Sequence, residues 1–153
     1  GITFNWGVLV GYAATTGTIS LAAVVFWLGA VFWTLGYDTI YAMSDVEDDA
    51  LIGVKSTARH FGANAALWVG WFYANAILLF VIAMLIESNA IRTTLAAIPA
   101  FLILQSHFRW QCLTLKGDSP NFTDIFRSNK TSGLLVILGL ICVVLSDLWI
   151  NSQ

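Results

Sequence analysis

Acidic residues gather in one short segment of the sequence, residues 38–49, which holds five of the nine acidic side chains of the 153-residue chain. If a helix continues through this segment, positions i, i+3, i+7 and i+11 share one face. Those positions are Asp38, Tyr41, Asp45 and Asp49. Three carboxylates and a phenol would then point the same way. Because like charges a turn apart repel each other, we expect a cation to offset them.

The side chains of this segment favour a hard divalent cation. They supply oxygen ligands only, and no His or Cys stands nearby at ligand spacing, so Mg²⁺ is expected first and Mn²⁺ or Ca²⁺ next. Mg²⁺ usually takes one or two protein carboxylates and completes its shell with water and phosphate oxygens. The acidic segment is therefore interpreted as half of a diphosphate site. The alternative is a solvated acidic loop, but Asp38 stands close to an apolar stretch, where ionisable groups are usually functional.

Two basic residues, Lys55 and Arg59, follow the acidic segment and are the first basic residues of the chain. Lys55 would be placed to neutralise a leaving diphosphate. The alternative is that both residues only anchor the chain at the membrane surface and pair with the acids.

The composition is that of a membrane protein. Hydrophobic residues make up 58% of the chain and charged residues only 10%, whereas about a quarter of the residues of a soluble domain are charged. Most of the outer surface must therefore face lipid. The net charge of −2 and the lack of a basic cluster in the sequence exclude nucleic-acid binding.

Apolar stretches of the sequence predict an all-α, polytopic transmembrane bundle that forms a single domain over residues 1–153. A helix needs about 20 apolar residues to cross a bilayer. The sequence predicts five such spans, the first of them short: residues 2–16, 19–42, 63–86, 91–113 and 133–150.

The longer polar segments, 43–62 and 114–132, fall on the same side of the membrane in this arrangement. They carry most of the basic residues, whereas the opposite side has only Arg92. By the positive-inside rule, the acidic segment therefore faces the cytoplasm, or the matrix in a mitochondrial protein. Within the second polar segment, Asn129 and Lys130 either cap this end of the site, which the surrounding turn residues favour, or begin the fifth helix. Cys112 and Cys142 are interpreted as packing residues.

An extended motif around the acidic segment resembles the signature of UbiA-type membrane prenyltransferases, in the 4-hydroxybenzoate polyprenyltransferase branch of ubiquinone synthesis. A later stretch, residues 126–129 followed by Gly133, is similar to the end of that branch. The matching residues of the first stretch are Tyr37-Asp38-Thr39, Tyr41-Ala42, Asp45-x-x-Asp48-Asp49 and Gly53-x-Lys55-Ser56-Thr57-Ala58.

The resemblance implies nine spans around a central cavity, in which Mg²⁺ between two aspartate motifs binds a polyprenyl diphosphate. The metal ligands it implies are Asp45 and Asp49, which match the family's DxxxD pair, together with Asp48. It implies further that the resulting allylic cation alkylates an aromatic acceptor. The remaining candidates are Asp38, Tyr41 and Lys55 for catalysis, and Lys55 and Arg59 for diphosphate binding.

The chain departs from this family pattern, because the first motif, NDxxDxxxD, is absent. We therefore expect a C-terminal half that is inactive alone and needs an N-terminal half, in the inner membrane of a bacterium or a mitochondrion. The expected acceptor is 4-hydroxybenzoate, with haem, a naphthoate or chlorophyllide as alternatives. A cation transporter fragment that uses Asp38, Asp45 and Asp49 is another alternative. It is disfavoured because the third to fifth spans hold no acid before Asp147.

Overall fold

The computed structural model describes residues 2–46, 51, 53, 55–88 and 94–152 of the chain. This part of the chain is helical and contains no strand, which confirms the all-α prediction. The elements are α1 (Trp6–Thr16), α2 (Leu21–Ser44), α4 (Thr57–Phe61), the 3₁₀ turn η1 (Gly62–Asn64), α5 (Ala65–Ser88), α7 (Ile98–Thr114), α8 (Phe122–Arg127) and α9 (Asn129–Asn151).

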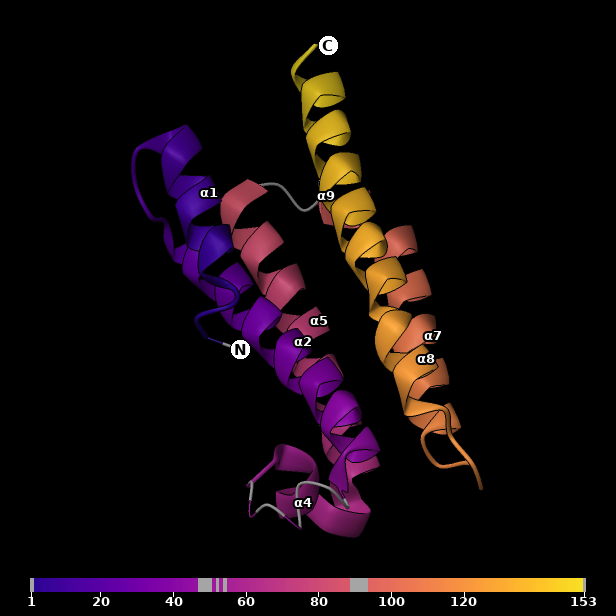
Figure 1. Ribbon diagram of the computed structural model, residues 1–153. Helices are drawn as coiled ribbons and strands as arrows, with labels where there is room; N and C mark the ends of the chain where they lie inside the picture. Colours follow the sequence, from indigo (N-terminus) through magenta and orange to yellow (C-terminus); the bar gives the residue numbers. More distant parts are fainter. Residues whose placement is uncertain (1, 47–50, 52, 54, 89–93, 153) are drawn as a thin grey trace.

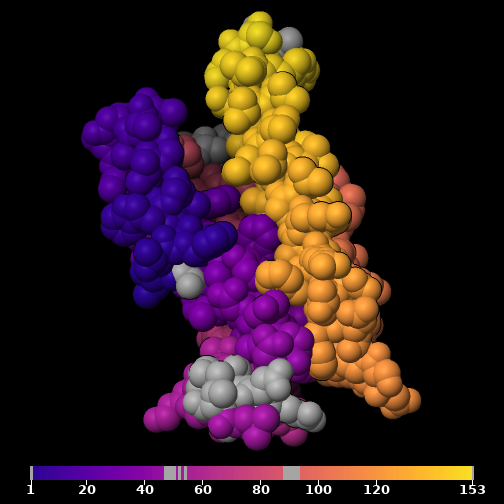
Figure 2. Space-filling model, viewed as in Figure 1, coloured from indigo at the N-terminus to yellow at the C-terminus, as the bar shows by residue number. Residues whose placement is uncertain are grey.

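The long helices form two groups that lie side by side. Helices α1, α2 and α5 make one group, and α7 and α9 make the other (Figure 1). The short helices α4 and α8 lie at the end of the bundle where α2 ends, and the C-terminus lies at the opposite end (Figure 1). Toward the C-terminal end the surface is hollowed between α1 and α9 (Figure 2).

Small residues of α2 allow its close packing against α5. A Cβ atom at Gly29 would lie 2.8 Å from Cδ1 of Phe80, so the ring of Phe80 occupies the space that a side chain would need. The α5 helix is joined to α7 by Tyr73 and Phe108, whose rings are stacked with centroids 3.9 Å apart. This packing runs through the fully buried residues of the core, which include Ile40, Val69, Phe80 and Leu104.

Local signals account for the ends of α1 and α2. The backbone N–H of Gly17 caps α1 by donating to the carbonyl of Ala13, with a φ of 75° that favours glycine. The α2 helix begins after Ser20, whose hydroxyl accepts a hydrogen bond from the backbone N–H of Ala23 at 3.2 Å. These two signals separate the first two helices.

Helical segments long and apolar enough to cross a membrane are Leu21–Ser44, Thr57–Glu87 and Phe122–Asn151 in the described part of the chain. They correspond to the predicted spans 19–42, 63–86 and 133–150. The predicted spans 2–16 and 91–113 form the shorter helices α1, with 11 residues, and α7, with 17. Because a helix rises about 1.5 Å per residue, α1 is about half the thickness of the hydrocarbon core. Residues 91–93 lie outside the described ranges.

Candidate functional site

The C-terminal half of α2 carries the beginning of the acidic segment. The helix continues through Asp38 and Tyr41 to Ser44, and Asp45 is its C-cap residue. The side chains of Asp38 and Tyr41 are exposed, with 51% of the Tyr41 surface accessible. The helix therefore presents two of the four predicted residues from one face and ends at the third. The other acids of the segment, Asp48 and Asp49, lie outside the described residues.

The end of α2 is electrostatically suited to a cation. Asp45 adds a carboxylate where the helix already carries partial negative charge. The hydroxyl of Ser44 lies 2.6 Å from the carbonyl of Tyr41 and 3.1 Å from Oδ1 of Asp45, so its single proton is shared between them. That contact only partly offsets the charge of Asp45.

The carboxylate oxygens at the accessible end of α2 are the kind of ligand that Mg²⁺ prefers. Among the described residues, no group of three His, Cys, Asp or Glu side chains is close enough to hold a metal ion. Asp48 and Asp49 are not among these residues. Mg²⁺ commonly takes only one or two protein carboxylates, so the described residues neither complete nor contradict the predicted metal site.

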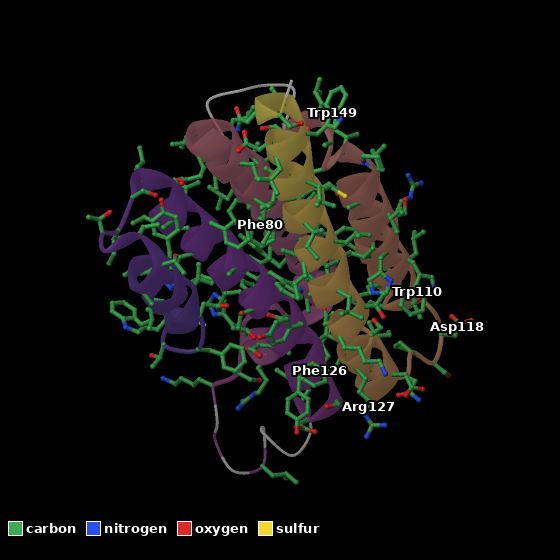
Figure 3. All side chains as sticks on the ribbon, turned by 90° about the horizontal axis from the view of Figure 1, so that it is seen from above. Phe80, Trp110, Asp118, Phe126, Arg127 and Trp149 are labelled. Carbon is green, nitrogen blue, oxygen red and sulfur yellow. The ribbon has the colours of Figure 1, made fainter. Side chains whose placement is uncertain are left out.

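Aromatic side chains form a wall beside Asp38, and we call this set of residues the aromatic wall. Ring centroids are 5.9 Å apart between Trp33 and Tyr37, 5.8 Å between Tyr37 and Phe126, and 5.2 Å between Tyr41 and Phe126. Phe126 belongs to α8, where its ring lies toward α2 while Arg127 points outward (Figure 3). The aromatic wall consists of Trp33, Tyr37, Tyr41 and Phe126.

The α4 helix brings the predicted Lys55 segment against α2. The hydroxyls of Thr39 in α2 and Thr57 in α4 are 3.1 Å apart, and Thr39 is fully buried. Thr39 is the immediate neighbour of Asp38, and Lys55 is two residues before Thr57. This hydrogen bond therefore fixes the Lys55 segment to the turn of α2 that carries Asp38. Lys55 itself is exposed.

Arg59 belongs to α4, on the side of α2 that Thr39 and Met43 share. It lines a small cavity of about 350 Å³ together with residues that include Met43 and Phe122. Met43 is five residues beyond Asp38, which places it on a different face of the helix from Asp38 and Tyr41. The described residues therefore place Thr57 and Arg59 on the side of α2 that carries Thr39 and Met43, whereas Asp38 and Tyr41 are exposed on another face.

A buried polar network, absent from the predicted site, joins α2, α5, α7 and the junction of α8 with α9. The hydroxyl of Tyr73 donates to Oε1 of Gln111 at 2.6 Å, and Nε1 of Trp33 donates to Oδ1 of Asn129 at 3.0 Å. The Tyr73 hydroxyl also lies 3.3 Å from Oδ1 of Asn129. The polar network consists of Trp33, Tyr73, His107, Gln111, Ser128 and Asn129.

The α7 side of the polar network reaches the end of α8. Nε2 of Gln111 donates to the hydroxyl of Ser128 at 2.9 Å and lies 3.1 Å from Nε2 of His107. The same His107 nitrogen is 3.2 Å from the carbonyl oxygen of Ser128. Gln111 is fully buried, and Asn129 is the first residue of α9. Asn129 and Lys130 thus begin the fifth helix, which was the less favoured of the two interpretations from the sequence.

The signal that would have identified this network was present in the sequence. Uncharged polar residues inside apolar helices are costly unless they bond to another helix. Gln111 stands in such a helix, and Asn129 stands where one begins. Their partners on other helices could not be read from spacing along one helix.

A second cavity lies at the other end of the bundle. Its volume is about 750 Å³, and mostly apolar residues of α1, α2, α5 and α9 line it, together with Tyr12, Glu87 and Asp147. Glu87 accepts hydrogen bonds from the hydroxyls of Tyr12 at 2.8 Å and Ser20 at 3.3 Å. Asp147, near the C-terminal end of α9, also lines this cavity.

Similarity to known proteins is extensive along this chain. The sequence model of the UbiA prenyltransferase family matches residues 1–130. A protein of Aedes aegypti named "4-hydroxybenzoate polyprenyltransferase, mitochondrial" is 38% identical over 146 residues, which cover 92% of this chain and 32% of the relative. The human protein of the same name is 38% identical over 152 residues, which cover 97% of this chain and 39% of the relative.

The chain spans about a third of the length of the curated relatives it matches. No solved structure matches it significantly. The family match covers most of the chain and includes the acidic segment, the Lys55 segment and α8. This chain belongs to the UbiA prenyltransferase family.

Proposed function

We propose that this chain forms part of an intramembrane prenyltransferase that moves a polyprenyl group from its diphosphate to an aromatic acceptor. The single observation that carries this proposal is the placement of Asp38 and Asp45 beside an accessible aromatic ring, Tyr41, where an apolar helix ends. The carboxylate end suits a metal-bound diphosphate, and the aromatic wall suits a planar acceptor. The names of the relatives favour 4-hydroxybenzoate as that acceptor.

Mg²⁺ is the proposed cofactor. Asp45 and Asp49 would hold it, with Asp48 as a further ligand, because these carboxylates follow one another at the end of α2 in the sequence. When bound, Mg²⁺ would neutralise charge on the leaving diphosphate. The absence of soft ligands near the segment is consistent with an ion that prefers oxygen.

Each remaining candidate has a proposed role in the reaction. The C1–O bond of the allylic diphosphate breaks, a bond forms between C1 and a ring carbon of the acceptor, and that ring carbon loses a proton. Lys55 would contact the diphosphate and offset its charge, and Arg59 would add positive charge at the same end. Tyr41 would pack against the acceptor ring, and Asp38 would accept the released proton.

We propose further that a second aspartate motif, supplied by an N-terminal half, completes the site. The relatives that match this chain are about three times as long as the matched part, and the sequence holds one acidic motif of the two that the family resemblance implies. Without the second motif the chain would be inactive. Residues of that half would enclose the open side of Asp38 and Tyr41.

The proposed location is the mitochondrial inner membrane, with the acidic segment on the matrix side. The names of the relatives include the word mitochondrial. The helices α4 and α8 lie at the end of the bundle where the acidic segment begins (Figure 1). They carry Arg59 and Arg127, and Lys116 stands in the turn between α7 and α8. The positive-inside rule assigns the end with these basic residues to the matrix. A bacterial inner membrane, with this end in the cytoplasm, is the alternative.

The test uses the complete polypeptide that contains this segment, in membranes supplied with polyprenyl diphosphate, an aromatic acceptor and Mg²⁺. Asp45→Ala and Asp49→Ala should each abolish transfer while the protein remains in the membrane. Asp118→Ala is a matched control, because Asp118 is an exposed acid in the turn after α7, and it should retain transfer. Transfer retained in both site variants would overturn the metal role.

Comparison of 4-hydroxybenzoate with a naphthoate, haem and chlorophyllide identifies the acceptor.

A further inference from the structure

Asn129 stands at the junction of α8 and α9 and makes its hydrogen bonds inside the protein. It is 9% exposed. Its amide nitrogen donates to the carbonyls of Ile125 at 3.4 Å and Phe126 at 3.2 Å. Its Oδ1 accepts from Nε1 of Trp33 at 3.0 Å and lies 3.3 Å from the hydroxyl of Tyr73. The Tyr73 hydroxyl shares its single proton between Oδ1 of Asn129 and the nearer Oε1 of Gln111, so both amide hydrogens and one acceptor position of Asn129 are fully engaged and the second acceptor position is engaged in part.

These four contacts tie one short helix to two long ones. The carbonyls of Ile125 and Phe126 belong to α8, whereas Trp33 belongs to α2 and Tyr73 to α5. A helix of six residues such as α8 has little stability of its own. Its position therefore depends on what it is attached to, and the amide of Asn129 is one direct attachment to α2 and α5.

The attachment determines where Phe126 lies. The amide of Asn129 holds the carbonyl of Phe126, and the ring of that residue contacts Tyr37 and Tyr41. Tyr41 and Asp38 are the exposed residues of this face of α2. A shift of α8 would move Phe126 and uncover Tyr41, while Asp45, on α2 itself, would keep its place.

We propose that Asn129 is a positioning residue for acceptor binding, which acts by holding Phe126 against Tyr41 in the aromatic wall. This inference rests on the proposed prenyl transfer. The aromatic wall would then bind the acceptor ring, and the end of α2 would bind the diphosphate. Loss of the Asn129 amide should weaken acceptor binding and leave diphosphate binding unchanged.

The experiment measures the two KM values separately in the complete polypeptide. Asn129→Leu removes all four contacts and should raise the KM for 4-hydroxybenzoate by about tenfold, the equivalent of about 1.4 kcal/mol. The KM for the polyprenyl diphosphate and the Mg²⁺ requirement should not change. Trp33→Phe removes the donor on α2 and keeps an aromatic ring at this position of the aromatic wall, so the KM for 4-hydroxybenzoate should rise by less than in Asn129→Leu and the KM for the diphosphate should not change. This second variant keeps the test decisive if Asn129→Leu does not fold.

The matched control is Asn75→Leu. Asn75 donates only within its own helix, to the carbonyl of Trp71 at 2.8 Å, and both KM values should stay at the wild-type level. An effect of Asn129 on folding alone would lower the amount of active enzyme without changing either KM. That result, or a parallel rise of both KM values, would overturn the positioning role.

A double variant tests whether Asn129 acts through Phe126. Phe126→Ala should raise the KM for 4-hydroxybenzoate, and adding Asn129→Leu should raise it no further. Independent, multiplicative effects would overturn the proposal. A wild-type enzyme that transfers no prenyl group to any aromatic acceptor would instead refute the proposed function, and that outcome is seen without any variant.

Discussion

Gly36 of α2 lies so close to the ring of Tyr73 of α5 that a methyl group at position 36 would overlap the ring. The ring cannot move away easily, because it is stacked on Phe108 and its hydroxyl is bonded to Gln111. This contact sets the spacing of the two helices beside the candidate site.

Gly36→Ala should therefore destabilise the protein. Forcing an extra methyl group into packed surroundings costs about 1–3 kcal/mol, and unfolding in mixed detergent micelles measures the loss. Gly11→Ala is the matched control, since a Cβ atom there would meet nothing within 4 Å, and its stability should not fall. Equal stabilities of the two variants would show that the contact with Tyr73 is not rigid.

Tyr73→Phe should also destabilise the protein, by about 1–3 kcal/mol, because it leaves the buried Oε1 of Gln111 without its donor. Tyr12→Phe removes a hydroxyl that bonds to the exposed carboxylate of Glu87, where water can replace it, so its effect should be smaller. The same unfolding measurement compares the two. A larger loss for Tyr12→Phe would contradict the importance of the polar network.

Thr39→Val should impair diphosphate binding. Valine keeps the shape of the fully buried threonine but removes the hydroxyl that holds Thr57 and, through it, the Lys55 segment. We expect the KM for the diphosphate to rise by about threefold to tenfold, as for loss of one hydrogen bond. Thr114→Val is the control, because that hydroxyl bonds only within its own helix, to Trp110. An unchanged KM in Thr39→Val would show that the bond between Thr39 and Thr57 does not contribute to diphosphate binding.

Chelation of divalent ions should stop prenyl transfer reversibly. The proposed carboxylate ligands at the end of α2 would hold Mg²⁺ without a soft ligand to retain it, so EDTA should remove the ion and added Mg²⁺ or Mn²⁺ should restore transfer. The amount of protein in the membrane should not change during the treatment. Transfer that continues in EDTA would argue against a metal-dependent reaction.

The proposed orientation can be tested by labelling single cysteines in a Cys112→Ser, Cys142→Ser background. Asp118→Cys, in the turn after α7, should react with an impermeant reagent only from the matrix or cytoplasmic side. Thr18→Cys, in the turn before α2, should react only from the opposite side. Labelling in the reverse sense would overturn the orientation assigned by the basic residues.

The helices themselves were predictable because apolar runs determine them. The predicted spans 19–42 and 63–86 differ from α2 and α5 by two residues at each end. The fifth predicted span began at residue 133, four residues late, because residues 129–132 are polar and resemble a turn. The structure forms helix there since Asn129 finds partners on α2 and α5, which the local sequence does not reveal.

The candidate site was predictable only where it follows one helix. Asp38, Tyr41 and Asp45 share α2 or its cap, so helical periodicity was enough to group them. Phe126 reaches Tyr41 from α8, and Gln111 of α7 joins the polar network through Tyr73. Their approach depends on how distant helices pack, and no spacing within the sequence encodes that directly.

The position of Asn129 has a consequence for the motions of α9. Its contacts with α2 and α5 are made by the first residue of the helix, whereas the far part of α9 borders the 750 Å³ cavity largely with aliphatic side chains such as Leu140, Val143 and Leu148. Apolar contacts slide at little cost, whereas buried polar bonds do not. In hydrogen–deuterium exchange, the α9 amides near residue 132 should therefore be protected longest, and those toward residue 150 should exchange soonest. The start of α9 would stay fixed while its C-terminal end moves.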